Sequence, residues 1–70
     1  MAHKVKTDIV VNPDVVHGKP VIRGTRVPVE VVLGGLAAGM SVSELAQEYG
    51  LTRPQIQSAI RYAHDVIEPD

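Results

Sequence analysis

The chain has 70 residues, a formal net charge of −1 and no cysteine. This length fits one domain, and the lack of cysteine excludes disulfide bonds and thiolate metal sites. A chain this short buries only roughly 60% of its unfolded surface, and with no Trp, no Phe and two Tyr its core must consist of small aliphatic side chains. We therefore expect residues 1–70 to form a single domain that gains stability by oligomerisation, most simply as a homodimer.

The charge is unevenly distributed along the chain. Residues 1–26 carry five Lys or Arg against two Asp, a sum of +3, and residues 27–70 carry two Arg against six Asp or Glu, a sum of −4. The acidic half disfavours non-specific DNA binding, because that affinity scales with the number of phosphates neutralised. No apolar run approaches the roughly 20 residues of a membrane-spanning helix, and no signal peptide is recognisable. We expect a cytoplasmic protein without membrane association.

The distribution of residue types divides the chain into a β part and a helical part. Ten of the twelve valines precede residue 33, and β-branched residues favour strands. We expect a flexible N-terminus at residues 1–7, a β element over residues 8–27 and three helices over residues 28–68.

Two β segments are predicted in the first part. A short strand is predicted from Thr7 to Val11, ended by the turn sequence Asn12-Pro13-Asp14. A tight hairpin is predicted over Pro20–Val27, with Gly24 supplying a positive φ in its turn. Because an isolated two-stranded ribbon is marginal in water, this hairpin needs the strand around Ile9 or a second subunit as a further partner.

The first helix is predicted from about Val29 to Ala38. Pro28 suits its start, apolar residues follow at helical spacing, and Gly39 ends it. Gly34 and Gly35 lie in the helix interior, where each costs up to about 1 kcal/mol relative to Ala. We interpret both as positions of close helix packing.

The next two helices are predicted from their caps. Ser41 is followed by Glu44 and Thr52 by Gln55, each three residues on, and both pairs are capping boxes that satisfy N–H groups at a helix start. Gly50 lies between the two helices, where a left-handed residue ends one helix and turns the chain into the next.

The spacing around this turn is typical of a helix-turn-helix. Ala46 precedes Gly50 by four residues and Ile56 follows it by six, which places a small residue and a branched aliphatic where two steeply crossed helices meet. The last helix is predicted to reach about Ile67, with Pro69 beyond it. This helix carries an apolar stripe that comprises Ile56, Ile60, Ala63 and Ile67. We expect the first helix or a second subunit to cover the end of this stripe.

The segment HGKPVIRGTRVPVEVVLGGLAAGMSVSELAQEYGLTRPQIQSAIRYA resembles the small bacterial proteins grouped as domain-of-unknown-function 433, many of which are considered antitoxin-like. The resemblance extends from Asp8 to about Ile67. It implies a mainly α, three-helix, homeodomain-like helix-turn-helix bundle with an N-terminal β-hairpin or short strands. It also implies pairing with a small PIN-like nuclease toxin. The residues that carry it are Gly18-Lys19-Pro20, Gly24-Thr25-Arg26-Val27-Pro28-Val29, Gly39, Leu45, Ala46, Tyr49, Leu51, Ile56, Ala59 and Tyr62-Ala63.

The outward face of the last helix holds the candidate DNA-binding residues Arg53, Gln57, Ser58 and Arg61. The start of the second helix of a helix-turn-helix enters the major groove, so Arg53 and Gln57 are candidates for contacts to base edges and Arg61 for a phosphate contact. The alternative is a solvated polar face on a purely structural bundle.

Three further cations, Lys19, Arg23 and Arg26, cluster on the predicted hairpin. They are candidates for contacts to DNA phosphates or to the acidic active site of a nuclease partner. A charged edge that discourages aggregation is the alternative. For Arg26 we favour a structural role, in which it holds a helix carboxylate such as Glu30.

No catalytic, metal or cofactor site is expected. His3, His17 and His64 are too scattered for a metal signature, and the glycines around Lys19 lack the spacing of a phosphate-binding loop. We expect a protein that is not an enzyme. Two hypotheses remain, an antitoxin that is a dimeric DNA-binding autoregulator and neutralises a PIN-like ribonuclease, and a protein-interaction module without DNA binding. Binding to the protein's own operator separates them.

Overall fold

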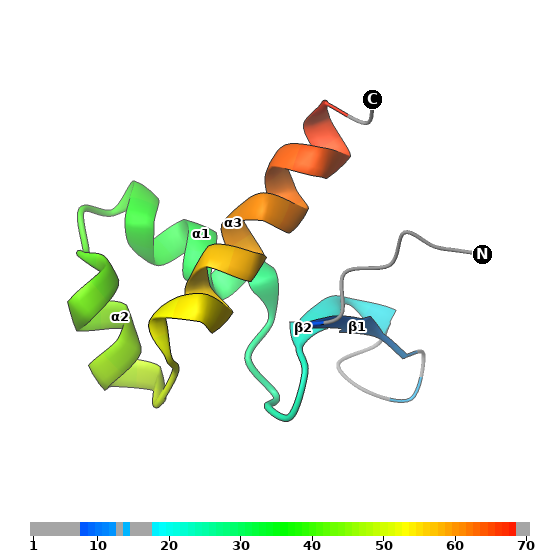
Figure 1. Ribbon diagram of the computed structural model, residues 1–70, viewed down its shortest axis with the longest axis horizontal. Coiled ribbons are helices and arrows are strands. Elements are labelled where there is room, and N and C mark those ends of the chain that lie inside the picture. The colour runs from blue at the N-terminus through cyan, green and yellow to red at the C-terminus, as the bar shows by residue number, and fades with distance from the viewer. Residues whose placement is uncertain (1–7, 13, 15–17, 69–70) are drawn as a thin grey trace.

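The computed structural model describes residues 8–12, 14 and 18–68. Its elements are β1 (Ile9–Val11), β2 (Pro20–Ile22), α1 (Val29–Ala37), α2 (Val42–Tyr49) and α3 (Arg53–Ile67). Figure 1 shows the strand pair and α2 at opposite sides of the molecule, with α1 and α3 between them. The structure confirms the expected mainly helical fold of three helices with short N-terminal strands. The expectation of a flexible N-terminus at residues 1–7 lies outside the described residues.

The two strands form an antiparallel ribbon. Ile9 lies opposite Ile22, and Val11 lies opposite Pro20. The N–H of Asp14 donates to the side chain of Asn12 (2.8 Å), as in a turn that an Asn initiates. The strand expected near Ile9 is therefore the partner that β2 requires.

The predicted hairpin over Pro20–Val27 is only half correct. Its turn is present, with Gly24 at a φ of +80°, but the returning arm is not a strand and makes a single isolated bridge between Val21 and Pro28. The carbonyl of Val27 in this arm accepts one hydrogen bond, from the N–H of Ile22 at the end of β2 (3.0 Å). The ladder does not continue at Val27 and Pro28, because the N–H of Val27 donates to the Thr25 hydroxyl (3.0 Å) and Pro28 has no N–H.

A Schellman motif ends α1. The N–H of Met40 donates to the carbonyl of Gly35 (2.9 Å), the N–H of Gly39 donates to that of Leu36 (3.0 Å), and Gly39 has a φ of +100°. This pair of hydrogen bonds is the usual way in which a left-handed residue satisfies the last carbonyls of a helix. The side chain of Met40 then packs against the core.

The two glycines inside α1 have different environments. A Cβ added to Gly35 would lie 2.6 Å from Leu45 Cδ2 and 3.2 Å from Met40 Sδ, whereas a Cβ on Gly34 would meet nothing within 4 Å. Close packing of α1 against α2 is therefore confirmed at Gly35. The same interpretation is wrong at Gly34, which is exposed.

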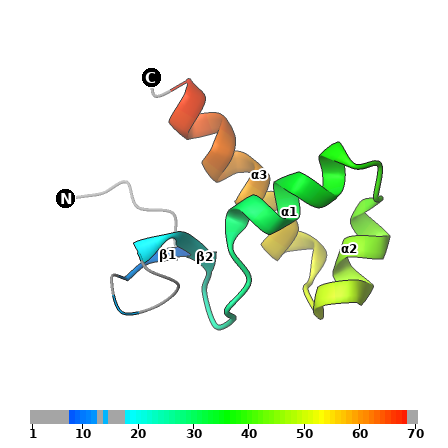
Figure 2. The same cartoon turned by 180° about the vertical axis from the view of Figure 1, so that it is seen from behind.

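The core lies where α3 packs against α1, α2 and β1. Figure 2 shows α3 crossing behind α1, with its C-terminal turns extending beyond the other helices. Among the described residues, the buried side chains are all aliphatic: Ile9, Val21, Ile22, Val29, Val32, Leu45, Leu51, Ile56 and Ala59.

The predicted apolar stripe of α3 is buried only at its start. Ile56 and Ala59 are fully buried, but Ile60 is 38% exposed and Ile67 is 76% exposed. The buried side of α3 runs from Ile56 to Ala59, three residues later. It continues to Ala63, four residues after Ala59, which is half-buried. Ile60 lies beside this line, because successive residues of a helix are turned by about 100°.

Candidate nucleic-acid interface

Both predicted capping boxes are present and determine where α2 and α3 begin. The Ser41 hydroxyl accepts from the N–H of Glu44 (3.0 Å), and Glu44 Oε1 accepts from the N–H of Ser41 (2.8 Å). At α3 the Thr52 hydroxyl accepts from the N–H of Gln55 (3.2 Å), and Gln55 Oε1 accepts from the N–H of Thr52 (2.8 Å). The four bonds leave little freedom in the position of each helix start.

The turn between α2 and α3 fixes the direction of α3. Gly50 has a φ of +67° and a ψ of +36°, the left-handed conformation that glycine adopts without strain. The N–H of Leu51 donates to the carbonyl of Ala46 (2.9 Å), and the Leu51 side chain is buried. Because the turn is anchored in the core on both sides, the outward face of α3 is held in one orientation.

That outward face carries a row of polar residues. Arg53, Gln57 and Arg61 are all exposed and follow one another at intervals of four residues. At a rise of about 1.5 Å per residue, such a row extends about 12 Å along the helix. This length is similar to the width of the major groove, about 12 Å. The structure thus brings three of the four predicted α3 residues onto one face.

Two residues of the same face were not predicted from the sequence. Ile60 and His64 line a shallow hollow on α3 together with Gln57 and Arg61, and His64 Nδ1 lies 3.3 Å from Asp65 Oδ1. The available signal was the spacing of three residues from Gln57 to Ile60 and from Arg61 to His64. Including Ile60 in the apolar stripe and considering His64 only as a candidate metal ligand obscured it.

Ser58, the fourth predicted residue of α3, connects α3 to the N-terminal segment. Its hydroxyl donates to Asp8 Oδ2 (2.8 Å) and is partly buried. Asp8 also accepts the N–H of Arg23 at its backbone carbonyl (2.7 Å). Asp8 therefore joins α3 to the turn after β2, which places the backbone of Arg23 close to α3.

The three cations expected on the hairpin are exposed but are not equivalent. Lys19 forms an ion pair with Glu30 (2.8 Å), with side chains 51% and 60% exposed. The expectation that Arg26 holds Glu30 is therefore wrong, since Lys19 takes that carboxylate. Arg23 and Arg26 belong to the segment between β2 and α1, and only Arg23 is tied to the neighbourhood of α3 by its backbone.

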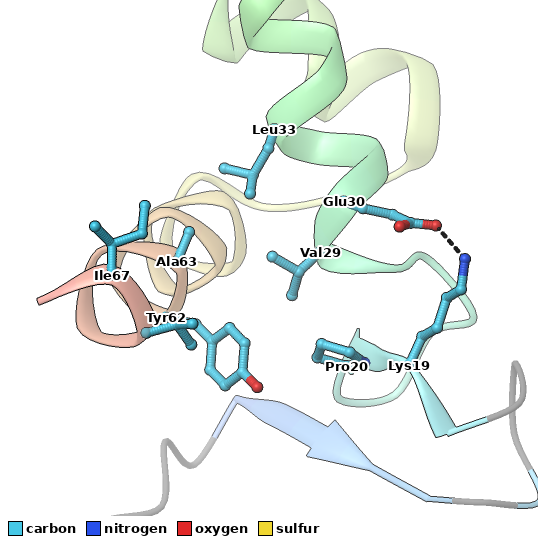
Figure 3. Close-up of a pocket in the computed structure, with 9 residues that line it drawn as sticks. Lys19, Pro20, Val29, Glu30, Leu33, Tyr62, Ala63 and Ile67 are labelled. Carbon is cyan, nitrogen blue, oxygen red and sulfur yellow. Dashed lines mark hydrogen bonds and ion pairs between the residues drawn. The ribbon is translucent and has the colours of Figure 1, made fainter. Parts of the chain in front are cut away.

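An apolar groove lies on another side of α3. It has a volume of about 300 Å³ and is bounded by the start of β2, α1 and the C-terminal half of α3. Figure 3 shows Tyr62, Ala63 and Ile67 on one side and Val29 and Leu33 on the other, with the pair of Lys19 and Glu30 at the edge. Val66, which also lines the groove, is 60% exposed.

Within residues 8–12, 14 and 18–68, no three His, Asp or Glu side chains lie close enough together to hold a metal ion. In the same part of the chain, no helix has the length and apolarity needed to cross a membrane.

Comparison with known proteins identifies relatives over most of the chain. A family model described as "Protein of unknown function (DUF433)" matches residues 9–63. The "Uncharacterized protein y4eO" of Sinorhizobium fredii is 43% identical over 53 residues, which cover 74% of this chain and 24% of that protein. The chain thus spans about a quarter of the length of this curated relative.

Two solved structures share the fold. The crystal structure of Rv2018 from Mycobacterium tuberculosis is 38% identical, with a TM-score of 0.67 over 74% of this chain and 24% of that chain. The crystal structure of a DUF433 member from Anabaena variabilis is 32% identical, with a TM-score of 0.80 over 89% of this chain and 62% of that chain. Since the family model also matches residues 9–63, the chain belongs to the DUF433 family of proteins of unknown function.

Proposed function

We propose that the domain is the DNA-binding and autoregulatory part of an antitoxin in a type II toxin–antitoxin module. It acts in the cytoplasm as a dimer, by binding rather than by catalysis. The observation that carries the proposal is the exposed row of Arg53, Gln57 and Arg61, directly after a helix-turn-helix turn in which Gly50 is left-handed.

The chemistry of the row suits double-stranded DNA. Gln pairs through two hydrogen bonds with adenine and Arg with guanine in the major groove, and each such pair is worth about 1–3 kcal/mol of discrimination. Arg53 and Gln57 take these roles at the start of α3, and Arg61 binds a phosphate further along. Arg23 and Arg26 add phosphate contacts that position the domain without selecting sequence. Lys19, which pairs with Glu30 (2.8 Å) in a solvent-exposed ion pair, is a further candidate for a phosphate contact.

A dimer supplies the affinity that one acidic domain lacks. Twofold symmetry places two α3 helices about 34 Å apart, one turn of DNA, and doubles the number of cations at the interface. Val66 and Ile67 are exposed and line the apolar groove. Their exposure supports association of two copies through the C-terminal half of α3. Covering such side chains in water is favourable, by about 25 cal/mol per Å² of apolar surface.

The partner that the proposal names is a PIN-like ribonuclease toxin. A nuclease with an acidic active site is complementary to the cations of the segment after β2, where Arg23 and Arg26 are exposed.

A specific observation favours the alternative of an interaction module without DNA binding. Glu44 and Glu48 are exposed on α2, and carboxylates near a DNA backbone weaken binding by repulsion.

Gel retardation at low salt separates these functions. The probes are duplex DNA from upstream of the protein's own gene and a scrambled duplex of equal composition. The proposal predicts retardation of both and preference for the upstream duplex, which Gln57→Ala reduces while leaving binding to the scrambled duplex unchanged. Absence of any retarded complex, together with co-purification of a nuclease, would establish the interaction module instead.

A further inference from the structure

An apolar side chain lies beside the polar row of α3. Ile60 is 38% exposed and shares a hollow with Gln57, Arg61 and His64. An isolated exposed isoleucine is ordinary in itself. Its position matters here, because it shares this hollow with three polar side chains of the surface proposed to contact DNA.

Thymine offers a matching group. In the major groove, the C5-methyl group of thymine is the apolar feature that distinguishes base edges, and apolar side chains contact it. We propose that Ile60 is a specificity-determining residue that packs against the methyl group of a thymine when α3 lies in the major groove. This inference rests on the proposed DNA-binding function and specifies one base that the domain selects.

The helix geometry places this thymine relative to the other contacts. Ile60 follows Gln57 by three residues, which is about 4.5 Å along the helix axis. Base pairs along one strand are about 3.4 Å apart. The thymine that Ile60 contacts therefore lies one or two base pairs from the base that Gln57 contacts, for which adenine is the matching partner.

The groove lined by Val66 and Ile67 differs in character. Its lining is apolar on both sides and includes Leu33 and Tyr62, whereas the neighbours of Ile60 are an amide, a guanidinium and an imidazole. Such groups donate hydrogen bonds to base edges and phosphates. This contrast favours DNA over a protein as the occupant of the Ile60 surface.

The test uses a duplex that the protein selects from a random library. Each thymine is replaced in turn by deoxyuridine, which removes the methyl group and keeps the hydrogen-bonding groups. For the wild-type protein, one thymine in each half-site should be sensitive, and its replacement should weaken binding about fourfold, the effect of exposing one buried methyl group.

Ile60→Ala should bind the thymine duplex about fourfold more weakly and be indifferent to deoxyuridine at that position. Val11→Ala, a matched removal of exposed aliphatic surface on β1, should keep the wild-type sensitivity; Val11 is 57% exposed. Both side chains are exposed and alanine favours helix at position 60, so circular dichroism should show both variants folded.

The inference is overturned if DNA binds but no thymine is sensitive, or if Ile60→Ala weakens both duplexes and keeps the methyl dependence. If the library yields no bound duplex, the proposed function fails together with it.

Discussion

The two adjacent glycines of α1 give a test in which the same substitution has opposite effects. Gly34→Ala adds a methyl group with no atom within 4 Å, so it should stabilise the domain by about 0.5–1 kcal/mol through helix propensity. Gly35→Ala gains the same propensity, but its methyl would lie 2.6 Å from Leu45 Cδ2. Leu45 is fully buried and cannot move without repacking, and overpacking of this kind costs about 1–3 kcal/mol.

The free energies of unfolding of the two variants should therefore differ only by the cost of overpacking. In a domain of this size 1 kcal/mol shifts the Tm by about 4–8 °C, so Gly35→Ala should melt at least about 4 °C below Gly34→Ala at equal protein concentration. On a Leu45→Ala background, where the clashing methyl is absent, Gly35→Ala should become neutral or stabilising. Equal melting temperatures for the two single variants would refute the close approach of α1 and α2 at Gly35.

Three further experiments test the caps, the turn and the dimer. Ser41→Ala should lower the free energy of unfolding in urea by about 0.5–2 kcal/mol, and the exposed Ser43→Ala should change it by less than about 0.5 kcal/mol; equal effects would exclude the capping role. Gly50→Val should cost about 1–2 kcal/mol in thermal melts and Gly50→Asn less, because Asn tolerates left-handed φ; equal costs would contradict strain as the cause. Val66→Glu should convert a dimer into a folded monomer in sedimentation, whereas a wild-type monomer at micromolar concentration would contradict the dimer.

The features predicted correctly from the sequence have local signals. A capping box involves residues three apart, and the sequence pairs Ser41 with Glu44 and Thr52 with Gln55, as the structure does. The left-handed Gly50 is equally local, since its conformation depends on the helix ending beside it. These signals placed α2 and α3, and hence the outward positions of Arg53, Gln57 and Arg61.

The features that were missed depend on residues distant in the sequence. Asp8 and Ser58 are 50 residues apart, and nothing in either local sequence indicates their hydrogen bond. Whether Gly34 or Gly35 approaches a neighbour depends on the rotation of α1 relative to Leu45. The exposure of Ile60 likewise depends on how far α1 and α2 cover α3, which residue spacing does not reveal.

The site prediction was limited by the same cause. Lys19 and Arg26 are equally plausible partners of Glu30 by charge, and only the path of the chain between β2 and α1 decides for Lys19. The sequence therefore gives the identity of the cations, and the fold determines which of them lie near α3.

The most direct test of the central claim, that α3 contacts DNA through its outward row, is binding to the upstream and scrambled duplexes across salt concentration. Arg61→Gln should reduce the slope of log K against log salt by about 0.9 for each phosphate that the variant no longer neutralises. Arg53→Gln should reduce the preference for the upstream duplex by about 1–3 kcal/mol. Unchanged slope and preference in both variants, or no binding of either duplex by the wild-type protein at low salt, would contradict the claim.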